Sequence, residues 1–365
     1  MNLLERIFVL IGFLSLLAGP VSAEVVLHRG NGTEPDTLDP HRAGGTWENN
    51  IIGDMFLGLT TEAVDGTAIP GAATSWTVSD DGLVYTFTLR AGALWSDGMP
   101  VTASDFVFGF RRIINPITAA RYASLLFPIK NAYQINTGKL PPDQIGIRAV
   151  DPMTLEITLE SPTPFLPEML THYTTFAIPE HTYKQHGEDW VKPGNMVSNG
   201  PYLLDEWVSN AHVKVRKNQR FYDADNVSID TVYYYPIEDA RTALKMFQSG
   251  EIDMNITTGG FPAALIDDVL AEFPGEARVY PYLGNSYLPF LISRPPFDDI
   301  RVRKAISMLI DREIINDRIV NVGNKSAYAF VPPNTNNHRA GATLDFTELS
   351  LSQRFAEARQ LLTEA

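Results

Sequence analysis

The sequence contains no cysteine among its 365 residues. Disulfide bonds, thiolate metal sites, a cysteine nucleophile and a lipid attached through an N-terminal cysteine are therefore excluded. A chain exported without disulfides must gain its stability from size, and this length is enough to bury more than one hydrophobic core. With 44% hydrophobic and 20% charged residues, the composition is typical of a globular protein.

Long hydrophobic runs are also scarce. One apolar stretch, Ile7 to Leu17, follows Arg6 and is too short to span a membrane. The small residues Val21-Ser22-Ala23 then fit the pocket of a signal peptidase, so Met1 to Ala23 predicts a secretory signal peptide and a mature chain that begins at Glu24. An uncleaved anchor or a disordered tail are the alternatives. We expect a periplasmic protein without an integral membrane segment in its mature chain.

Positive charge is in deficit, with 29 basic against 43 acidic residues and a formal net charge of −14. Phosphate backbones attract basic surfaces, so the sequence argues against a nucleic-acid partner. An acidic surface favours solubility and attracts cationic ligands weakly.

Motifs of catalysis and cofactor binding are missing as well. The sequence holds no G-x-S-x-G, G-x-x-x-x-G-K, G-x-G-x-x-G after a strand or H-E-x-x-H. His181 and His186 are five residues apart, which does not place them on one helical face. Asp97 and Asp105 resemble an acid and base pair, but a turn role and a cap role account for them. We expect no enzymatic activity, no cofactor and no metal.

Strand and helix patterns alternate irregularly, which predicts a mixed α/β architecture of two or more lobes. Tyr85 to Leu89 alternates apolar and polar residues as a half-buried strand does, and Thr102 and Asp105 have the spacing of a helix capping box. We expect Arg111 and Arg112 to complement the carbonyl end of that helix.

Similar patterns predict helices and strands in the later part of the chain. A helix is predicted from Asp239 to Ser249, ending at a left-handed Gly250, with strands at 232–237 and 252–256 on either side. Apolar spacing predicts a further helix from Asp299, and Asp311 is expected to cap the next one. Ser352 precedes a last apolar face, and we expect the chain to stop inside its fold at Ala365.

Several long motifs resemble one family, the family 5 bacterial solute-binding proteins. The resemblance is strongest between Ala73 and Phe106, where A-T-S-W-T-V-S-D-D-G, Y-T-F-T-L-R and W-S-D-G-M-P-V-T-A-S-D-F follow one another. Further matches are Asn31-Gly32-Thr33-Glu34, Leu38-Asp39-Pro40-His41, Asn199-Gly200-Pro201-Tyr202, Ser249 to Asp253 and Pro295 to Ala305. Within the family, the chain is most similar to the oligopeptide-binding branch.

The resemblance implies a class II periplasmic binding protein-like fold, with two lobes around a cleft and an extra domain in the first lobe. It places domain I at 24–56 and 180–283, domain II at 57–179 and the start of an incomplete domain III at 284–365. Full-length relatives continue further and complete domains III and I, so we expect a chain that ends at Ala365 to bind ligand poorly or to misfold.

The implied function is the capture of oligopeptides for an ABC importer, with permease and ATP-binding subunits as partners and the receptor itself a monomer. Tyr122 matches a cleft tyrosine of the family, although packing explains it equally well. Gly45 and Thr46, with Gly44, match a loop that offers backbone groups to the peptide, but Gly44 stands where the family has a peptide-contacting glutamate.

In the last third of the chain, Asn285 and Tyr287 match positions that line the family's cleft; packing is an equal alternative for Tyr287. Gly284 stands where some relatives have a disulfide-bonded cysteine. We interpret Asn199-Gly200-Pro201 as a structural turn. Another solute on the same fold, such as a dipeptide, opine, oligosaccharide or nickel chelate, is the first alternative function. An exported hydrolase is the second.

Overall fold

The computed structural model describes residues 23–256, 260–280, 282–320, 322–333, 335, 338 and 341–365. The predicted signal peptide falls outside these ranges except for Ala23, so its cleavage site stays a prediction. The chain separates into two compact units, Met1–Gly260 and Phe261–Ala365. The division into domains I, II and III, with its own boundaries, stays a prediction too.

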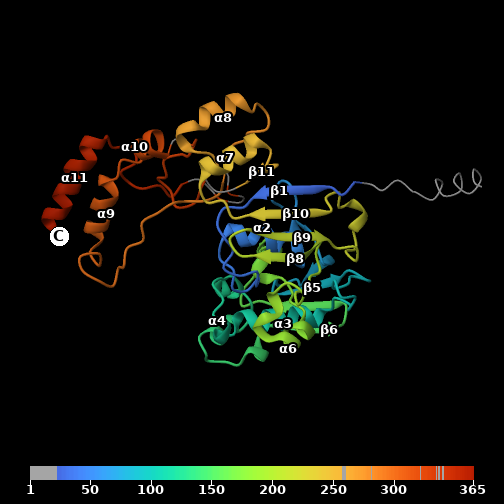
Figure 1. Cartoon of the computed structure of the whole chain (residues 1–365). Helices are drawn as coiled ribbons and strands as arrows, with labels where there is room; N and C mark the ends of the chain where they lie inside the picture. Colours follow the sequence, from blue (N-terminus) through green and yellow to red (C-terminus); the bar gives the residue numbers. More distant parts are fainter. Residues whose placement is uncertain are drawn as a thin grey trace, which may run out of the picture. The chain divides into compact units, whose positions relative to one another are not determined.

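The first unit contains a mixed five-stranded sheet with the strand order β11-β1-β10-β9-β8 (Figure 1). The strands are β1 (Val26–Gly30), β8 (Tyr202–Val208), β9 (His212–Lys217), β10 (Thr231–Tyr235) and β11 (Met254–Asn255). Strand β1 pairs in parallel with both β10 and β11, whereas β10, β9 and β8 are antiparallel. The predicted strands at 232–237 and 252–256 correspond to β10 and β11, and β1 lies between them in the sheet.

Helices α2 (Thr46–Met55) and α7 (Ala240–Ser249) belong to the same unit as this sheet. The predicted left-handed Gly250 at the end of α7 is confirmed, with φ 77°. Asp239, predicted as the start of the helix, is its N-cap, since its carboxylate accepts from the Thr242 N–H. Strand β10 ends at Tyr235, two residues before the predicted end, because Pro236 has no N–H for the ladder. Strand β11 is two residues long and therefore shorter than predicted.

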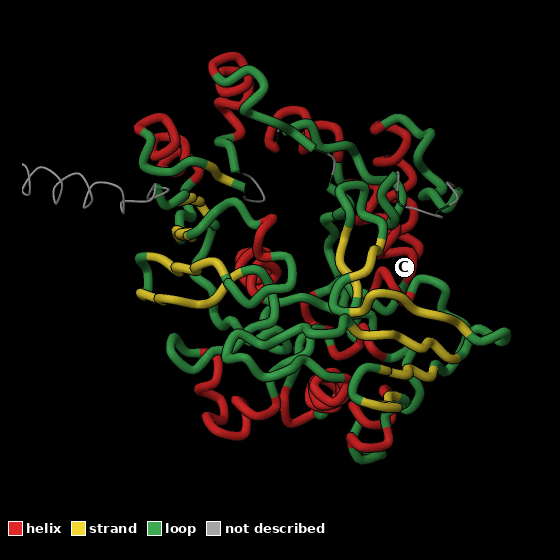
Figure 2. Tube along the Cα trace, turned by 90° about the vertical axis from the view of Figure 1, so that its right-hand side faces the viewer, coloured by secondary structure: helices red, strands yellow, loops and turns green. Residues whose placement is uncertain are grey.

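An antiparallel sheet with the order β4-β5-β7-β6 forms the other half of this unit. Its strands are β4 (Ala73–Val78), β5 (Val84–Leu89), β6 (Ile147–Asp151) and β7 (Thr154–Thr158), and β2 (Thr60–Glu62) pairs separately with β3 (Ala68–Pro70). The predicted alternation in β5 is confirmed, because Tyr85, Phe87 and Leu89 are buried. The two sheets and their long connections are seen in Figure 2.

Helix α3 (Ala103–Ile114) packs beside β6, and the predicted capping box is confirmed. The Asp105 carboxylate accepts from the Thr102 N–H at 2.8 Å. The remaining helices of the unit are α4 (Ala132–Asn136), α5 (Leu166–Met169) and α6 (Glu180–His186), with short 3₁₀ helices at Pro116–Thr118, Ala123–Leu126, Pro142–Gln144, Tyr173–Thr175, Gly187–Val191 and Ala224–Asn226.

The second unit is helical in its described residues. It contains a 3₁₀ turn at Ala263–Leu265, α8 (Ile266–Glu272), α9 (Ile300–Leu309), α10 (Arg312–Ile314), a π-helical stretch at Ile315–Val320 and α11 (Leu351–Glu364). The predicted helix start near Asp299 is confirmed, with Asp299 as the N-cap of α9, and the predicted cap Asp311 of α10 is confirmed as well. Helix α11 begins at Leu351 rather than after Ser352, because Ser350 and Gln353 form the capping box.

The predicted mixed α/β fold is therefore confirmed. No helix in the described ranges combines the length and the apolar composition that crossing a bilayer requires.

Candidate functional site

The loop before α2 is shaped by a buried carboxylate. Glu48, in the first turn of α2, is 1% exposed and accepts hydrogen bonds from the Gly45 N–H at 2.7 Å and the Asp36 N–H at 3.0 Å. A Cβ on Gly45 would lie only 2.5 Å from Glu48 Oε2, so this close approach requires glycine. The predicted residues Gly45 and Thr46 thus sit on a fixed loop, with Thr46 exposed.

Tyr122 lies beside this loop. Its hydroxyl donates to the Gly44 carbonyl oxygen at 3.1 Å, and its side chain is 37% exposed. Its ring meets His172 edge-on, with centroids 5.1 Å apart. The structure therefore brings together Gly44, Gly45, Thr46 and Tyr122 from segments 78 residues apart in sequence.

Two further aromatic residues join the site, and neither was predicted from the sequence. The Tyr173 hydroxyl donates to the Ala43 carbonyl at 3.2 Å, and its ring stacks on His172 with a centroid distance of 4.3 Å. Burial raises the pKa of Tyr173 and lowers the pKa of His172, so both are neutral at pH 7. The only sequence signal is the isolated aromatic pair in T-H-Y-T, which periodicity cannot assign to a site.

Below this loop lies a buried ion pair. Arg112 of α3 donates to both carboxylate oxygens of Asp39, at 2.9 and 2.5 Å, and contacts His41 Nδ1 at 2.9 Å. Burial alone would raise the pKa of Asp39, but Arg112 holds it below its usual value. Burial, and then the positive charge of Arg112, lower the pKa of His41 to about 4.

This cluster adds a role that the sequence did not predict. Arg111 and Arg112 lie in the last turn of α3 as predicted, and Arg112 is in addition the partner of Asp39. Asp39 also accepts from the His41 N–H, and its carbonyl accepts from the Ala43 N–H at 2.9 Å. The ion pair therefore fixes the backbone that leads into Gly44.

In the second unit, the predicted residues Asn285 and Tyr287 both contact Phe330. The Asn285 amide donates to the Phe330 carbonyl at 2.9 Å and to the Ala329 carbonyl at 3.3 Å. Tyr287 is 64% exposed, and its ring lies 5.6 Å from that of Phe330. These two predicted residues form a group of their own, in a different unit from Gly45, Thr46 and Tyr122.

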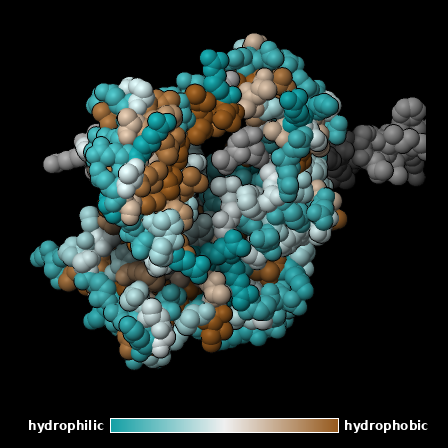
Figure 3. All heavy atoms as spheres, turned by 90° about the vertical axis from the view of Figure 1, so that its left-hand side faces the viewer, coloured by the Kyte–Doolittle hydropathy of each residue, from teal (hydrophilic) through white to brown (hydrophobic). Residues whose placement is uncertain are grey.

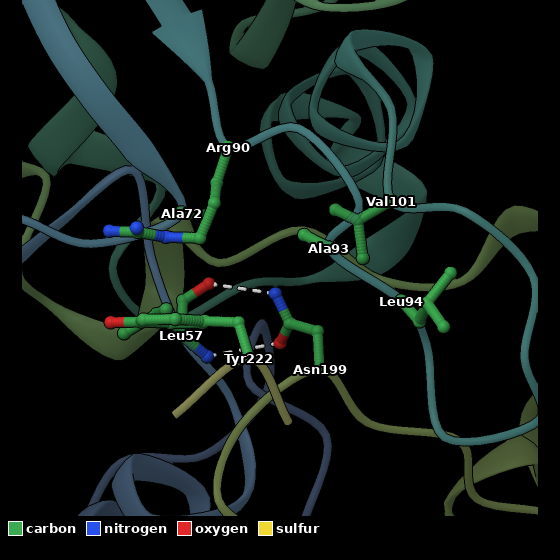
Figure 4. Close-up of a pocket in the computed structure, with 8 residues that line it drawn as sticks. All are labelled: Leu57, Ala72, Arg90, Ala93, Leu94, Val101, Asn199 and Tyr222. Carbon is green, nitrogen blue, oxygen red and sulfur yellow. Dashed lines mark hydrogen bonds between the residues drawn. The ribbon is translucent and has the colours of Figure 1, made fainter. Parts of the chain in front are cut away.

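A pocket in the first unit has a structural role. It is lined by Leu57, Ala72, Arg90, Ala93, Leu94, Val101, Asn199 and Tyr222 (Figure 4). The Asn199 amide donates to the Leu57 carbonyl and accepts from the Leu57 N–H, both at 3.0 Å, and the Arg90 guanidinium covers the Tyr222 ring. Because both ends of the Asn199 amide bind backbone, the structural interpretation of the Asn199-Gly200-Pro201 turn holds.

Asp97, Asp105 and His181, considered above as catalytic or metal-binding groups, have hydrogen-bond partners. Asp97 accepts from the Met99 N–H at 3.0 Å and also pairs with His181 Nε2 at 2.6 Å, a contact that the sequence did not indicate. Within the part of the chain that the structure describes, no three histidine, aspartate or glutamate side chains gather closely enough to hold a metal ion.

Comparisons with known proteins identify the family of the chain. The chain is 39% identical to the periplasmic oligopeptide-binding protein OppA of Escherichia coli, over 100% of this chain and 69% of that protein. It is 36% identical to the probable deoxycholate-binding periplasmic protein YgiS of Escherichia coli, over 95% and 64%. The crystal structure of Haemophilus influenzae OppA in complex with the peptide RPPGFSPFR matches with a TM-score of 0.88 and 32% identity, over 94% of this chain and 67% of that one.

The chain thus spans about two thirds of the length of the relatives it matches. The model of the bacterial extracellular solute-binding proteins, family 5, matches residues 67–365. Motifs, fold and comparisons converge, and the chain belongs to family 5 of the bacterial extracellular solute-binding proteins.

Proposed function

We propose that this chain is a periplasmic receptor that binds oligopeptides and delivers them to the permease of an ABC importer, without catalysing a reaction. The observation that carries the proposal is the set of main-chain groups beside Tyr122. Among the described hydrogen bonds, none uses the N–H of Gly44 or of Thr46, and Tyr122 is exposed next to them. A receptor for peptides of varied sequence needs such main-chain contacts, because the backbone is what all peptides share.

Asn285 and Tyr287 would supply further peptide contacts from the second unit. Tyr287 offers an exposed amphipathic ring of the kind that is enriched at binding surfaces. Export after cleavage at Ala23 would place the receptor in the periplasm, where the relatives named above act according to their names.

The direct test is to incubate the purified chain with a defined peptide mixture and to analyse the retained and free fractions by mass spectrometry. Intact peptides should be retained, and Tyr122→Ala should reduce retention by roughly tenfold, the size of about 1.4 kcal/mol of lost contact. Tyr133→Ala is the matched control, since Tyr133 is another exposed tyrosine and packs on Phe127 instead. Steady cleavage of the peptides would contradict the proposal and support a hydrolase.

A second candidate ligand is an amphipathic steroid acid. Its support is the 36% identity to a protein named as probably deoxycholate-binding, together with the aromatic rings of Tyr122, His172 and Tyr173. Titration calorimetry with deoxycholate and with a retained peptide separates the two ligands. Binding of deoxycholate without binding of any peptide would replace the peptide proposal.

A further inference from the structure

The side chain of Arg121 lies directly over Gly44. A Cβ on Gly44 would stand 2.6 Å from both Cδ and Nη1 of Arg121 and 3.1 Å from Cζ. Any side chain at position 44 would therefore displace the guanidinium. Glycine at this position leaves room for the Arg121 side chain to pack on the loop. The Tyr122 hydroxyl donates to the Gly44 carbonyl of the same loop.

The charge of Arg121 is only weakly compensated within the protein. Its guanidinium lies 3.6 Å from the Asp36 carboxylate, and the two side chains are 61% and 77% exposed. An ion pair this exposed contributes at most about 1 kcal/mol, so the guanidinium is free to exchange partners. Glu48, the nearby buried carboxylate, is already occupied by the N–H groups of Gly45 and Asp36.

Apart from Asp36 and the occupied Glu48, the loop and the adjoining Tyr122 offer hydrogen-bond donors and aromatic rings. The N–H groups of Gly44 and Thr46 have no partner among the described hydrogen bonds, and Thr46 stands at the N-terminus of α2. His172 is neutral, because burial lowers its pKa, and it adds a ring rather than a charge. A planar guanidinium beside backbone donors matches a carboxylate, which can accept two parallel hydrogen bonds from arginine.

We infer that Arg121, seated over Gly44, makes this site select ligands that present a carboxylate next to Tyr122. The inference rests on the proposed peptide-binding function and specifies its substrate class. The carboxylate can come from an acidic side chain or from the C-terminus of a bound peptide, and both have the same chemistry at the guanidinium.

Calorimetric titration of the purified chain with a matched alanine-based peptide set tests the inference. The set places glutamate or glutamine at each position in turn, and each peptide is made with a free and an amidated C-terminus. We expect one carboxylate to tighten binding by roughly 3- to 10-fold at low salt, and we expect this gain to shrink at 0.5 M salt, where charges are screened. A glutamate position identifies a side-chain carboxylate, and an effect of amidation identifies the C-terminus.

Three variants distinguish a direct contact of Arg121 with the ligand carboxylate from a purely structural role of Arg121. Arg121→Gln should abolish the preference, and Arg121→Glu should reverse it. Asp36→Asn should strengthen it, since the competing carboxylate is removed. Arg148→Gln, which changes an exposed arginine on β6 that pairs with Glu156, is the matched control and should leave the preference intact.

Two results would overturn the inference alone: peptides bind with equal affinity whatever their carboxylates, or Arg121→Gln weakens all of them equally. Failure of every peptide to bind would overturn the proposed function and the inference with it.

Discussion

The two units of this chain bury their apolar side chains to very different degrees. The first unit has a continuous core that runs through both sheets and includes the fully buried Trp95, Trp190 and Phe87. In the described residues of the second unit, the buried cluster contains Ala305, Met308, Phe346 and Ala358, and Ile266, Val269 and Val302 are buried outside it. Since burial of apolar area is the main favourable term in folding, we expect the second unit to unfold first.

The contrast is sharpest in the segment 279–292 of the second unit. Its exposed apolar residues are Val279, Tyr280, Tyr282, Leu283, Tyr287, Leu288, Leu291 and Ile292. Apolar surface of this kind appears as brown patches on the face drawn in Figure 3. No β-strand forms among the described residues of this segment. An apolar pattern does not make a strand by itself, because a strand also needs a partner for its N–H and C=O groups.

The largest effect is expected from Arg112→Ala in the first unit. The substitution leaves the Asp39 carboxylate buried without its partner, which costs about 3–5 kcal/mol. Calorimetric scanning should show a lower midpoint for the high-temperature transition, which we assign to the first unit. The midpoint of the low-temperature transition, assigned to the second unit, should be unchanged. Arg148→Ala, which breaks an exposed pair, should cost at most about 1 kcal/mol. A similar effect of both substitutions would contradict the role we assign to the buried pair.

A smaller effect, confined to the second unit, is expected from Phe346→Ala. Phe346 is 1% exposed, and its removal should cost about 3 kcal/mol, at the low end of the usual range because a small core relaxes more easily. The low-temperature transition should disappear while the upper one stays in place. Phe330→Ala, at a side chain that is 71% exposed, is the control. A shift of the upper transition would show that the units do not unfold separately.

Lowering the pH should weaken the first unit selectively. His41 is neutral in the folded state, with a pKa of about 4 against 6.5 when unfolded, so the unfolded state binds more protons between these values. The contribution of neutral His41 to the free energy of unfolding is therefore fully present above pH 6.5, and it falls by roughly 2 kcal/mol by pH 5. Asp39, whose folded pKa is lowered, adds a further loss below pH 3.8.

Burial is the largest cause of the lowered pKa of His41, Arg112 lowers it further, and Asp39 opposes the shift. Glu188 and the Tyr183 ring lie across Arg112 from His41. The second unit contains one histidine, His338, which is exposed rather than buried. Thermal scans at pH 7.5, 6 and 5 measure the predicted decline, and His41→Gln should flatten it. An equal decline in the variant would assign it to other groups.

The smallest effect is a gain in the first unit. Gly53 lies exposed inside α2, and a Cβ there meets nothing within 4 Å. Gly53→Ala should raise the free energy of unfolding by roughly 0.5–1 kcal/mol, because alanine favours the helix. Gly250→Ala, at a φ of 77°, should lower it instead. Chemical denaturation curves measure both changes, and the same sign for both would refute the helix argument.

Local elements were predictable from the sequence because their signals are local. The capping box at Thr102 and Asp105 and the left-handed Gly250 mark helix ends within a few residues. The insertion of β1 between β10 and β11 was not predictable, since strand pairing joins segments about 200 residues apart and alternation does not encode partners. The Asp39 and Arg112 pair was missed for the same reason.

The candidate site residues were named by resemblance rather than by periodicity. The motif match assigned Tyr122 and the loop of Gly44 separately to the family's cleft, and the contact between them is a finding of the structure. The sequence did not reveal that Gly44 accommodates the Arg121 side chain, because a Gly-Gly pair is equally typical of an ordinary turn. His172 and Tyr173 carry no spacing signal that distinguishes them from packed aromatic residues.

Hydrogen exchange measured with and without a retained peptide tests the central claim most directly. The account predicts slower exchange in the fragments that cover 44–46 and 121–122 of the first unit and 285–287 of the second. Tight binding with unchanged exchange in the fragments around Gly44 and Tyr122 would contradict it.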